Sequence, residues 1–236
     1  MHNPTTEALP MSVPTVVLFD VNETLADLEP LRARFEAVGA PGRLLELWFA
    51  STLRDGFALT AAGAYGDFRT VALAVLRGLL TGVETLERDP HEAAGHVLAG
   101  LGELDVHPDV EEGMRTLADA GVRLATLTNG AAAIAAALLE RAGLAGLVER
   151  RISVDDVRSW KPAPEPYLHA ARELGVPPDR CALVAVHPWD IDGAKRAGLR
   201  AAWLNRRNSP YPDFFAAPDA RGETLAALAD ALLART

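Results

Sequence analysis

The chain has 236 residues, of which 49% are hydrophobic and 23% charged, and its formal net charge is −9 at pH 7. This composition excludes a disordered chain, and the length is enough for one sizeable α/β domain or for a core domain with an inserted cap. The acidic balance argues against nucleic acid or an anionic membrane as the main partner, but it allows a local basic pocket for a small anion.

The single cysteine, Cys181, cannot form a disulfide within the chain, which favours a reducing compartment. No uninterrupted apolar run reaches the roughly 18 residues that are typical of a membrane span. Residues 1–12 contain neither Lys nor Arg and no apolar stretch of the kind found in signal peptides. We therefore expect a cytoplasmic protein with a flexible tail over residues 1–12.

The first predicted element is a buried strand over residues 14–20, where a valine-rich apolar run ends in Asp20. Residues 31–101 repeat apolar side chains at helical spacing between Gly and Pro, which predicts several short helices and no strand. From residue 108 onward, the pattern alternates between helix and strand. We expect helices over 108–120, 131–142, 164–174, 191–197 and 223–233, and strands over 122–126, 152–154, 181–186 and 200–204.

This alternation is typical of a doubly wound, Rossmann-like α/β fold with a mostly parallel sheet. The helical block then forms an all-helical cap that is inserted after the first strand. We place the core at residues 13–28 and 106–236 and the cap at residues 29–105.

Polar side chains gather in four loops that this topology brings to the carboxyl edge of the sheet, where ligands bind in such folds. They are Asp20, Asn22, Thr24, Thr128, Asn129, Lys161, His187, Trp189, Asp190 and Asp192. An aspartate after a strand is often only a turn former or a helix cap. The four loops together, with two or three carboxylates and one ammonium, favour a functional site.

Four segments resemble, in order, the motifs of the haloacid dehalogenase superfamily. They are residues 19–25 (FDVNETL), residues 127–130 (LTNG), the Lys161-Pro162 pair and the acidic loop through Asp190. Within that superfamily the chain looks most like the L-2-haloacid dehalogenases. The features that carry this likeness are Tyr167 six residues after the lysine, Trp189 before Asp190, and the WLNR segment at residues 203–206.

The resemblance implies a mechanism in which the Asp20 carboxylate attacks the halogen-bearing carbon and expels halide. Water then hydrolyses the aspartyl ester. The two steps together are covalent catalysis by a carboxylate. It also implies that Lys161 keeps Asp20 ionised. Thr24 and Asn129 would hold the carboxylates and loops, and Asp190 would orient Lys161 and the hydrolytic water.

For the substrate, the resemblance implies that Thr128 and the backbone amides of Val21 and Asn22 bind a carboxylate. Tyr167 and Trp189 would line the pocket, although packing alone explains both side chains as well. The expected partner is a small anionic molecule, no cofactor is expected, and the family's habit of forming homodimers makes a homodimer an expectation here.

Several positions depart from the family pattern. Asn22 stands where a tyrosine is usual, and Phe49 stands where an arginine seats the leaving halide. Ala185 and His187 stand where a serine and an asparagine position water. His187 and the indole of Trp189 are then the donors left for a departing fluoride, so a small fluoro-acid is one predicted substrate. If His187 instead faces the interior of the sheet, activity on all haloacids should be low.

Two other functions stay open at this point. In a magnesium-dependent phosphatase, Asp20 would attack phosphorus, and Asp190 or Asp192 would help to hold the metal. Such enzymes generally protonate the leaving alkoxide with an aspartate two residues after the nucleophile, and Asn22 cannot supply that proton. In a non-catalytic binding protein, a costly buried pair of Asp20 and Lys161 would have no purpose.

The histidines do not suggest a zinc site, because no Cys or His pair completes a tetrad. We interpret most of them as surface or structural residues and only His187 as placed for chemistry. The other five are His2, His91, His96, His107 and His169.

Overall fold

The computed structural model describes residues 13–234, so the predicted tail over residues 1–12 and His2 lie outside the described residues. A six-stranded sheet runs through the core in the order β3-β2-β1-β4-β5-β6. All five neighbouring pairs are parallel. The strands are β1 (Val16–Phe19), β2 (Arg123–Thr128), β3 (Val148–Ser153), β4 (Cys181–Ala185), β5 (Arg200–Leu204) and β6 (Ala220–Gly222). The predicted doubly wound parallel sheet is thus confirmed.

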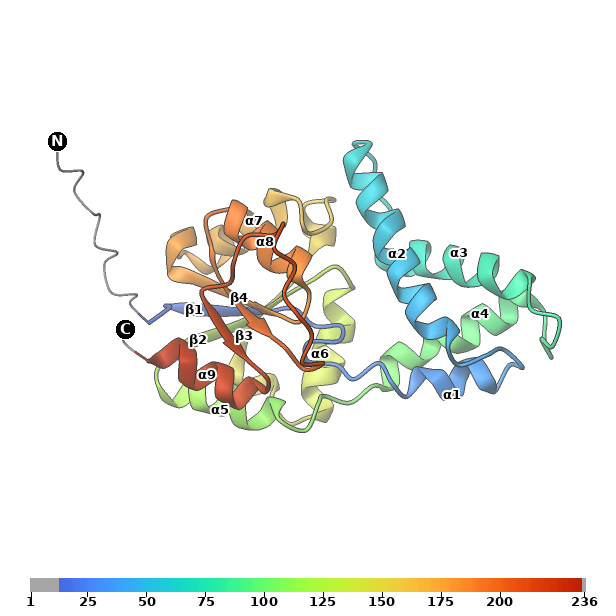
Figure 1. Ribbon diagram of the computed structural model, residues 1–236, viewed down its shortest axis with the longest axis horizontal. Helices are drawn as coiled ribbons and strands as arrows, with labels where there is room; N and C mark the ends of the chain where they lie inside the picture. Colours follow the sequence, from blue (N-terminus) through green and yellow to red (C-terminus); the bar gives the residue numbers. More distant parts are fainter. Residues whose placement is uncertain (1–12, 235–236) are drawn as a thin grey trace.

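Helices cover both faces of this sheet (Figure 1). One face packs against α5 (Val110–Asp119), α6 (Ala132–Arg141) and α9 (Leu225–Leu233), and the other against α7 (Pro164–Leu174) and α8 (Pro188–Arg196). In β1, Val17 and Phe19 face the first layer, whereas Val16 and Leu18 face the second. All four side chains are fully buried, which is why this strand reads as a continuous apolar run.

Four helices between β1 and α5 stand to one side of the sheet, and we call them the cap (Figure 1). They are α1 (Leu31–Glu36), α2 (Leu44–Ala61), α3 (Phe68–Thr81) and α4 (Pro90–Ala99). The side chains of Asp67 and Asp89 accept hydrogen bonds from the first backbone amides of α3 and α4 and so fix where these helices begin. Single-turn 3₁₀ segments follow at Gly100–Glu103, Ala145–Leu147, Val154–Asp156 and Pro178–Arg180.

Two predicted elements differ from those observed, and one observed strand was not predicted. The cap was expected to contain only short helices, but α2 runs for 18 residues straight through Gly56. Strand β3 begins at Val148 rather than residue 152, because its exposed, arginine-rich first half hides the strand pattern. The three-residue edge strand β6 was not predicted, since so short and half-exposed a segment has no hydrophobic periodicity.

Gly56 is needed because α2 packs directly on the loop that precedes Lys161. A Cβ atom at residue 56 would lie 2.3 Å from a ring carbon of Trp160. The Trp160 ring is fully buried, stacks on Phe68 at 5.8 Å between centroids, and donates from Nε1 to Gly66 O at 2.9 Å. Trp160 therefore fastens the loop of the core to the cap.

Among residues 13–234, no helix combines the length and the apolar character needed to cross a membrane.

We expect Trp160→Ala to lower the free energy of unfolding by about 3 kcal/mol, because the change removes a fully buried indole and one hydrogen bond. Urea unfolding followed by circular dichroism measures this difference. Leu47→Ala, at a side chain that is half exposed on the same cap, is the control and should cost less than about 1 kcal/mol. Equal losses in the two variants would contradict the anchoring role of Trp160.

Candidate active site

Asp20 follows β1 directly and lies at the carboxyl edge of the sheet. Its amide donates to Val184 O at 3.0 Å, which extends the pairing with β4 by one residue. The Thr24 hydroxyl donates to Asp20 Oδ2 at 2.7 Å and accepts a hydrogen bond from Val186 N at 3.2 Å. Because only 4% of Asp20 is exposed, these contacts fix the direction of its carboxylate.

The Lys161 ammonium is fully buried between two carboxylates. Its Nζ donates to Asp20 Oδ1 at 2.9 Å, to Asp190 Oδ2 at 2.6 Å and to Leu127 O at 2.9 Å. All three N–H donors of the ammonium are thereby used. Asn129 fixes the lysine backbone from both sides, because Oδ1 accepts from Lys161 N at 2.9 Å and Nδ2 donates to Lys161 O at 3.3 Å.

Asp190, in the first turn of α8, is also fully buried. Its Oδ2 accepts from Lys161, and its Oδ1 accepts from the Tyr167 hydroxyl at 2.5 Å. Helix α8 comes this close because residue 193 is glycine, where a Cβ would lie 2.6 Å from the Tyr167 hydroxyl oxygen. Both oxygens of Asp190 are therefore committed to protein donors.

His187 lies between two carboxylates on the cap side of the site. Its Nδ1 is 3.3 Å from Asp20 Oδ2 and is buried without a hydrogen-bond partner. Its Nε2 is 2.9 Å from Glu23 Oε2, and the other Glu23 oxygen accepts from Arg207 Nη2 at 2.8 Å. The ring of Trp189 stacks on the imidazole at 5.0 Å.

The position of His187 bears on the role that the sequence suggested for it, which is to donate a hydrogen bond to a departing fluoride. A halide leaves from the side of the carbon opposite to the attacking oxygen. A side chain that lies 3.3 Å from an Asp20 oxygen is therefore on the attacking side. His187 faces the crevice rather than the sheet interior, but the group that it touches is the nucleophile.

The charges at the site set the protonation state of each group. Burial alone would raise the pKa of Asp20, but Lys161, His187 and Thr24 together hold it well below its ordinary value. Burial would lower the pKa of Lys161, and Asp190 and Asp20 raise it instead. Asp20 is therefore a carboxylate, and Lys161 is an ammonium.

The same balance acts on His187 and Tyr167. Burial would lower the pKa of His187, but contacts with Asp20 and Glu23 raise it to about 9. Burial, together with the Asp190 charge, raises the pKa of Tyr167 well above its ordinary value, so its hydroxyl keeps the proton that it donates. His187 is accordingly an imidazolium while both neighbouring carboxylates are ionised.

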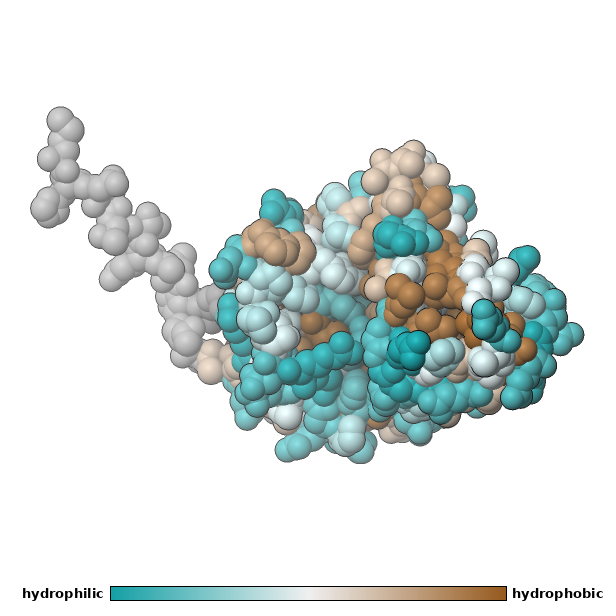
Figure 2. Space-filling view, turned by 45° about the vertical axis from the view of Figure 1, so that its right-hand side comes forward, coloured by the Kyte–Doolittle hydropathy of each residue, from teal (hydrophilic) through white to brown (hydrophobic). Residues whose placement is uncertain are grey.

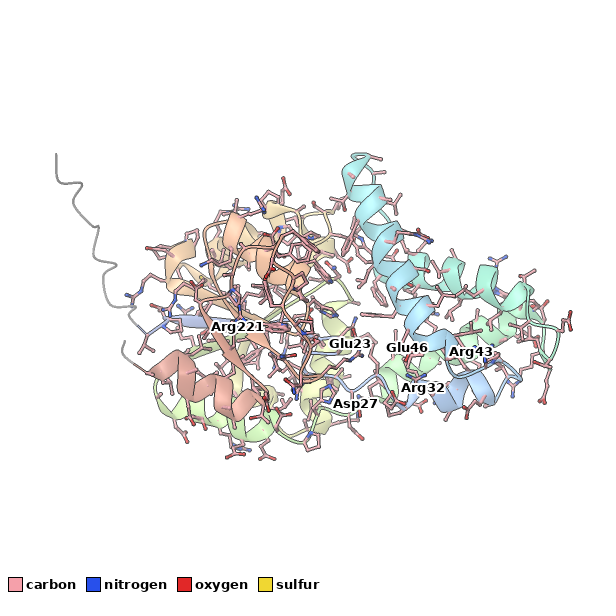
Figure 3. The ribbon with its side chains drawn as sticks, viewed as in Figure 1. Glu23, Asp27, Arg32, Arg43, Glu46 and Arg221 are labelled. Carbon is pink, nitrogen blue, oxygen red and sulfur yellow. The ribbon has the colours of Figure 1, made fainter. Side chains whose placement is uncertain are left out.

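A cavity of about 760 Å³ lies between the core and the cap, next to this cluster. Glu23 reaches it from the core, and Arg32 and Glu46 reach it from the cap (Figure 3). His187 and Phe49 line it, with ring centroids 6.1 Å apart. His187 also lies next to Asp20, so this imidazole connects the cavity wall with the Asp20 carboxylate.

The other residues that the sequence assigned to substrate binding occupy different places. Tyr167 is fully buried beneath Asp190 rather than on the cavity wall, so its predicted lining role is wrong. Thr128 is 2% exposed, and its Oγ1 accepts from Gly130 N at 2.9 Å. Val21 is 2% exposed, and Asn22 lies half-buried in the same turn, where it bridges to Ala26.

Sequence reasoning missed several residues that shape the turn after Asp20. Glu23 has a positive φ of 63° and binds His187, yet the first motif, which contains it, suggested no role for it. His107, interpreted as surface or structural, contacts Glu23 O at 3.1 Å and lines the cavity. Arg206 donates to Thr24 O at 3.0 Å and to Asp109 Oδ1 at 2.7 Å. Only the WLNR segment offered a signal for Arg206.

In the part of the chain that the structure describes, no group of three or more His, Cys, Asp or Glu side chains has an arrangement that could hold a metal ion.

The model of one protein family, haloacid dehalogenase-like hydrolase, matches residues 14–198. This span covers more than half of the chain and includes all four motifs from residue 19 to Asp190, while the WLNR segment at residues 203–206 lies beyond it. The chain therefore belongs to the haloacid dehalogenase-like hydrolase family.

Individual proteins support the same assignment. The chain is 29% identical over 221 residues to (S)-2-haloacid dehalogenase 1 of Pseudomonas sp. (strain CBS-3), covering 93% of this chain and 96% of that protein. It is 34% identical over 190 residues to the plasmid-encoded phosphoglycolate phosphatase of Cupriavidus necator, covering 78% of both. Its structure resembles the L-2-haloacid dehalogenase of Xanthobacter autotrophicus with chloropropionic acid covalently bound. That match has a TM-score of 0.81 and 26% identity, and it covers 92% of this chain and 97% of the other.

Because the pKa of His187 is raised, we expect the free energy of unfolding to decrease as pH rises. A group whose pKa is raised by folding, here from 6.5 to about 9, contributes stability that is complete below pH 6.5 and is lost as pH rises through about 9. The loss should be on the order of 1–3 kcal/mol between these limits. Urea unfolding at closely spaced pH values from 6 to 9.5 measures it.

In that experiment His187→Gln should flatten the decline, whereas His91→Asn, at an exposed position on α4, should leave it unchanged. The same slope in wild type and His187→Gln would show that this imidazole does not titrate as described.

Proposed function

We propose that this hydrolase cleaves the carbon–halogen bond of small (S)-2-haloacids through an ester on Asp20. The observation that carries the proposal is a buried, ionised Asp20 carboxylate held at 2.9 Å by a fully buried Lys161. A carboxylate in bulk water is a weak nucleophile because water solvates its charge. Burial removes that water, and the ammonium keeps the carboxylate ionised in spite of it.

In the first step an Asp20 oxygen attacks C2 of the substrate, and the halide leaves with the bonding electron pair from the opposite side. The configuration at C2 inverts. In the second step water adds to the ester carbonyl carbon, so the bond that breaks is the acyl C–O bond and C2 is untouched. An (S)-2-haloacid therefore gives an (R)-2-hydroxy acid.

We assign the substrate carboxylate to Thr128 and to the backbone amides of Val21 and Asn22. The Thr128 oxygen accepts from Gly130 N at 2.9 Å, which leaves its hydroxyl proton for an incoming carboxylate. Thr24 and Asn129 would hold the Asp20 carboxylate and the Lys161 backbone through the bonds described above. Trp189 would support the site from behind the His187 ring.

A phosphatase is the second candidate, because a phosphoglycolate phosphatase is among the relatives. Phosphate ester cleavage expels an alkoxide, which needs a proton, whereas a halide needs none. Asn22 occupies the position two residues after Asp20 and has no proton to give at neutral pH. This difference favours halide over alkoxide as the leaving group.

The proposal extends to the cofactor requirement, the compartment and the oligomeric state. We propose that the reaction needs no cofactor, that the protein works in the cytoplasm, and that two copies associate. The last is supported by apolar surface on the cap (Figure 2). Independently, Leu47 of α2 is a large apolar side chain that is half exposed. Size-exclusion chromatography with light scattering tests the association.

Which halide leaves best depends on the wall that faces the nucleophile. Phe49, only 6% exposed, packs its ring 6.3 Å from Trp48 and offers no hydrogen-bond donor. Arg54, one turn further along α2, pairs with Asp55 and is largely exposed. A large, polarisable halide leaves more readily than fluoride into such a wall, so release of fluoride stays a prediction for the substrate panel to test.

Asp20→Asn should abolish halide release while leaving the fold intact, because the amide has no charge with which to attack. The assay measures fluoride, chloride and phosphate from fluoroacetate, (S)-2-chloropropionate and p-nitrophenyl phosphate, each with and without Mg²⁺. Asp119→Asn, at an exposed position on α5, is the matched control. If wild type releases phosphate only with Mg²⁺ and releases no halide, the proposed dehalogenase function is contradicted and the phosphatase function is supported.

Phe49→Arg should raise the rate of chloride release several-fold, because the guanidinium supplies a donor and a positive charge where the halide departs. Phe49→Leu is the control for the change in packing and should not raise the rate. If Phe49→Arg and Phe49→Leu behave alike, halide departure does not depend on this position.

A further inference from the structure

We propose that His187 is the general base that hydrolyses the Asp20 ester and that Glu23 is the residue that orients it. This inference rests on the proposed function, since it concerns the second half of that reaction. Nothing in the family resemblance assigns either residue to this task, because the matching position is expected to carry an asparagine that positions water.

Ester hydrolysis needs a group that takes a proton from water beside the ester carbonyl. Asp190 is badly suited, because it is fully buried and both of its oxygens already accept hydrogen bonds from Lys161 and Tyr167. Residue 185, where the family pattern expects a serine, is a fully buried alanine. The hydrolytic step therefore needs a different base in this chain.

Three side chains of the described residues lie against the Asp20 carboxylate: Lys161, Thr24 and His187. Lys161 uses all three of its protons and has no lone pair to accept another. Thr24 is a hydroxyl and a very weak base. Only His187 has a nitrogen that can accept a proton near neutral pH, and that nitrogen is the unpartnered Nδ1.

Glu23 accepts a hydrogen bond from this imidazole in the same way that the aspartate of a hydrolytic triad accepts one from the catalytic histidine. It accepts from Nε2 at 2.9 Å, which leaves Nδ1 as the nitrogen beside the nucleophile. Arg207 donates to the second Glu23 oxygen at 2.8 Å, and the positive φ of Glu23 turns its side chain toward the ring. Stacking on Trp189 at 5.0 Å limits rotation of the imidazole.

Ester formation itself switches His187 from acid to base. In the free enzyme the ring faces two carboxylates, Asp20 and Glu23, with Lys161 on the far Asp20 oxygen and Arg207 behind Glu23. When Asp20 becomes a neutral ester, one of the two charges that favour the imidazolium disappears. The ring then releases its Nδ1 proton, which is the one proton that the overall reaction yields to solvent.

The remaining steps hydrolyse the Asp20 ester and return a proton to His187. Neutral His187 takes a proton from a water molecule as the water oxygen bonds to the Asp20 carbonyl carbon. The tetrahedral intermediate collapses and breaks the bond to the substrate oxygen. The imidazolium gives its proton to that alkoxide, which leaves as the 2-hydroxy acid. The new Asp20 carboxyl group then passes its proton to His187, and the ion pair of the free enzyme is restored.

The test is a rapid-quench experiment on (S)-2-chloropropionate with wild type, His187→Asn and the exposed-site control His91→Asn. Chloride is measured in the first turnover, and the ester on the Asp20 peptide is measured by mass spectrometry. We expect His187→Asn to release about one chloride per enzyme, to accumulate the ester, and to turn over ~100-fold more slowly than wild type. His91→Asn should match wild type.

Two outcomes would overturn the inference. One is His187→Asn turnover near the wild-type rate, and the other is slow first-turnover chloride with no ester, which would place His187 in the alkylation step. If wild type itself releases no chloride, the proposed function fails instead, so the two failures are distinguishable.

Glu23→Gln gives a second, independent readout in case His187→Asn is unstable. Loss of the Glu23 charge should lower the pKa of His187 in the ester state. The rise of the hydrolysis rate with pH should therefore move to lower pH by about one unit, with a lower plateau. Glu149→Gln, which breaks a comparable surface ion pair with Arg123, should leave the profile in place. An unshifted profile in Glu23→Gln would contradict the orienting role.

Discussion

The site depends on one buried ammonium that binds two buried carboxylates. Lys161, Asp20 and Asp190 are at most 4% exposed, and the two Nζ–carboxylate distances are 2.9 and 2.6 Å. Removing such charges from water costs several kcal/mol for each ion, and only close, fully hydrogen-bonded contacts offset that cost. The cluster therefore requires three loops to meet within a fraction of an ångström, and much of the core geometry serves that requirement.

Parallel strands bring these loops together. Strand β1 lies between β2 and β4, so the loop after each of these three strands opens at the same edge. Lys161 arrives from the loop that precedes α7, and its position depends on two anchors. Asn129 holds its backbone from the core, and Trp160 fastens the preceding residue to the cap. Through Trp160, docking of the cap and placement of the ammonium are linked.

The sequence was sufficient to predict the sheet class and to single out Asp20, which follows a strand, and Lys161, which lies in a loop; the structure brings these two side chains together. It was not sufficient for Glu23, because a turn residue with positive φ is placed by backbone geometry that no periodicity reveals. It also misplaced Tyr167, whose burial beneath Asp190 depends on the absence of a side chain at residue 193. The sequence was also not sufficient to predict on which side of the Asp20 carboxylate His187 lies, because tertiary packing decides this.

In the proposed mechanism, Asp20 becomes covalently bound to the substrate. This step can be measured. It is tested most directly by a single turnover in H₂¹⁸O with enzyme in excess over (S)-2-chloropropionate. If the account is right, the 2-hydroxy acid carries unlabelled oxygen from Asp20, and the Asp20 peptide gains one ¹⁸O when water attacks the ester carbonyl. Labelled product with an unlabelled Asp20 peptide would show that water attacks the substrate carbon directly, and would contradict it.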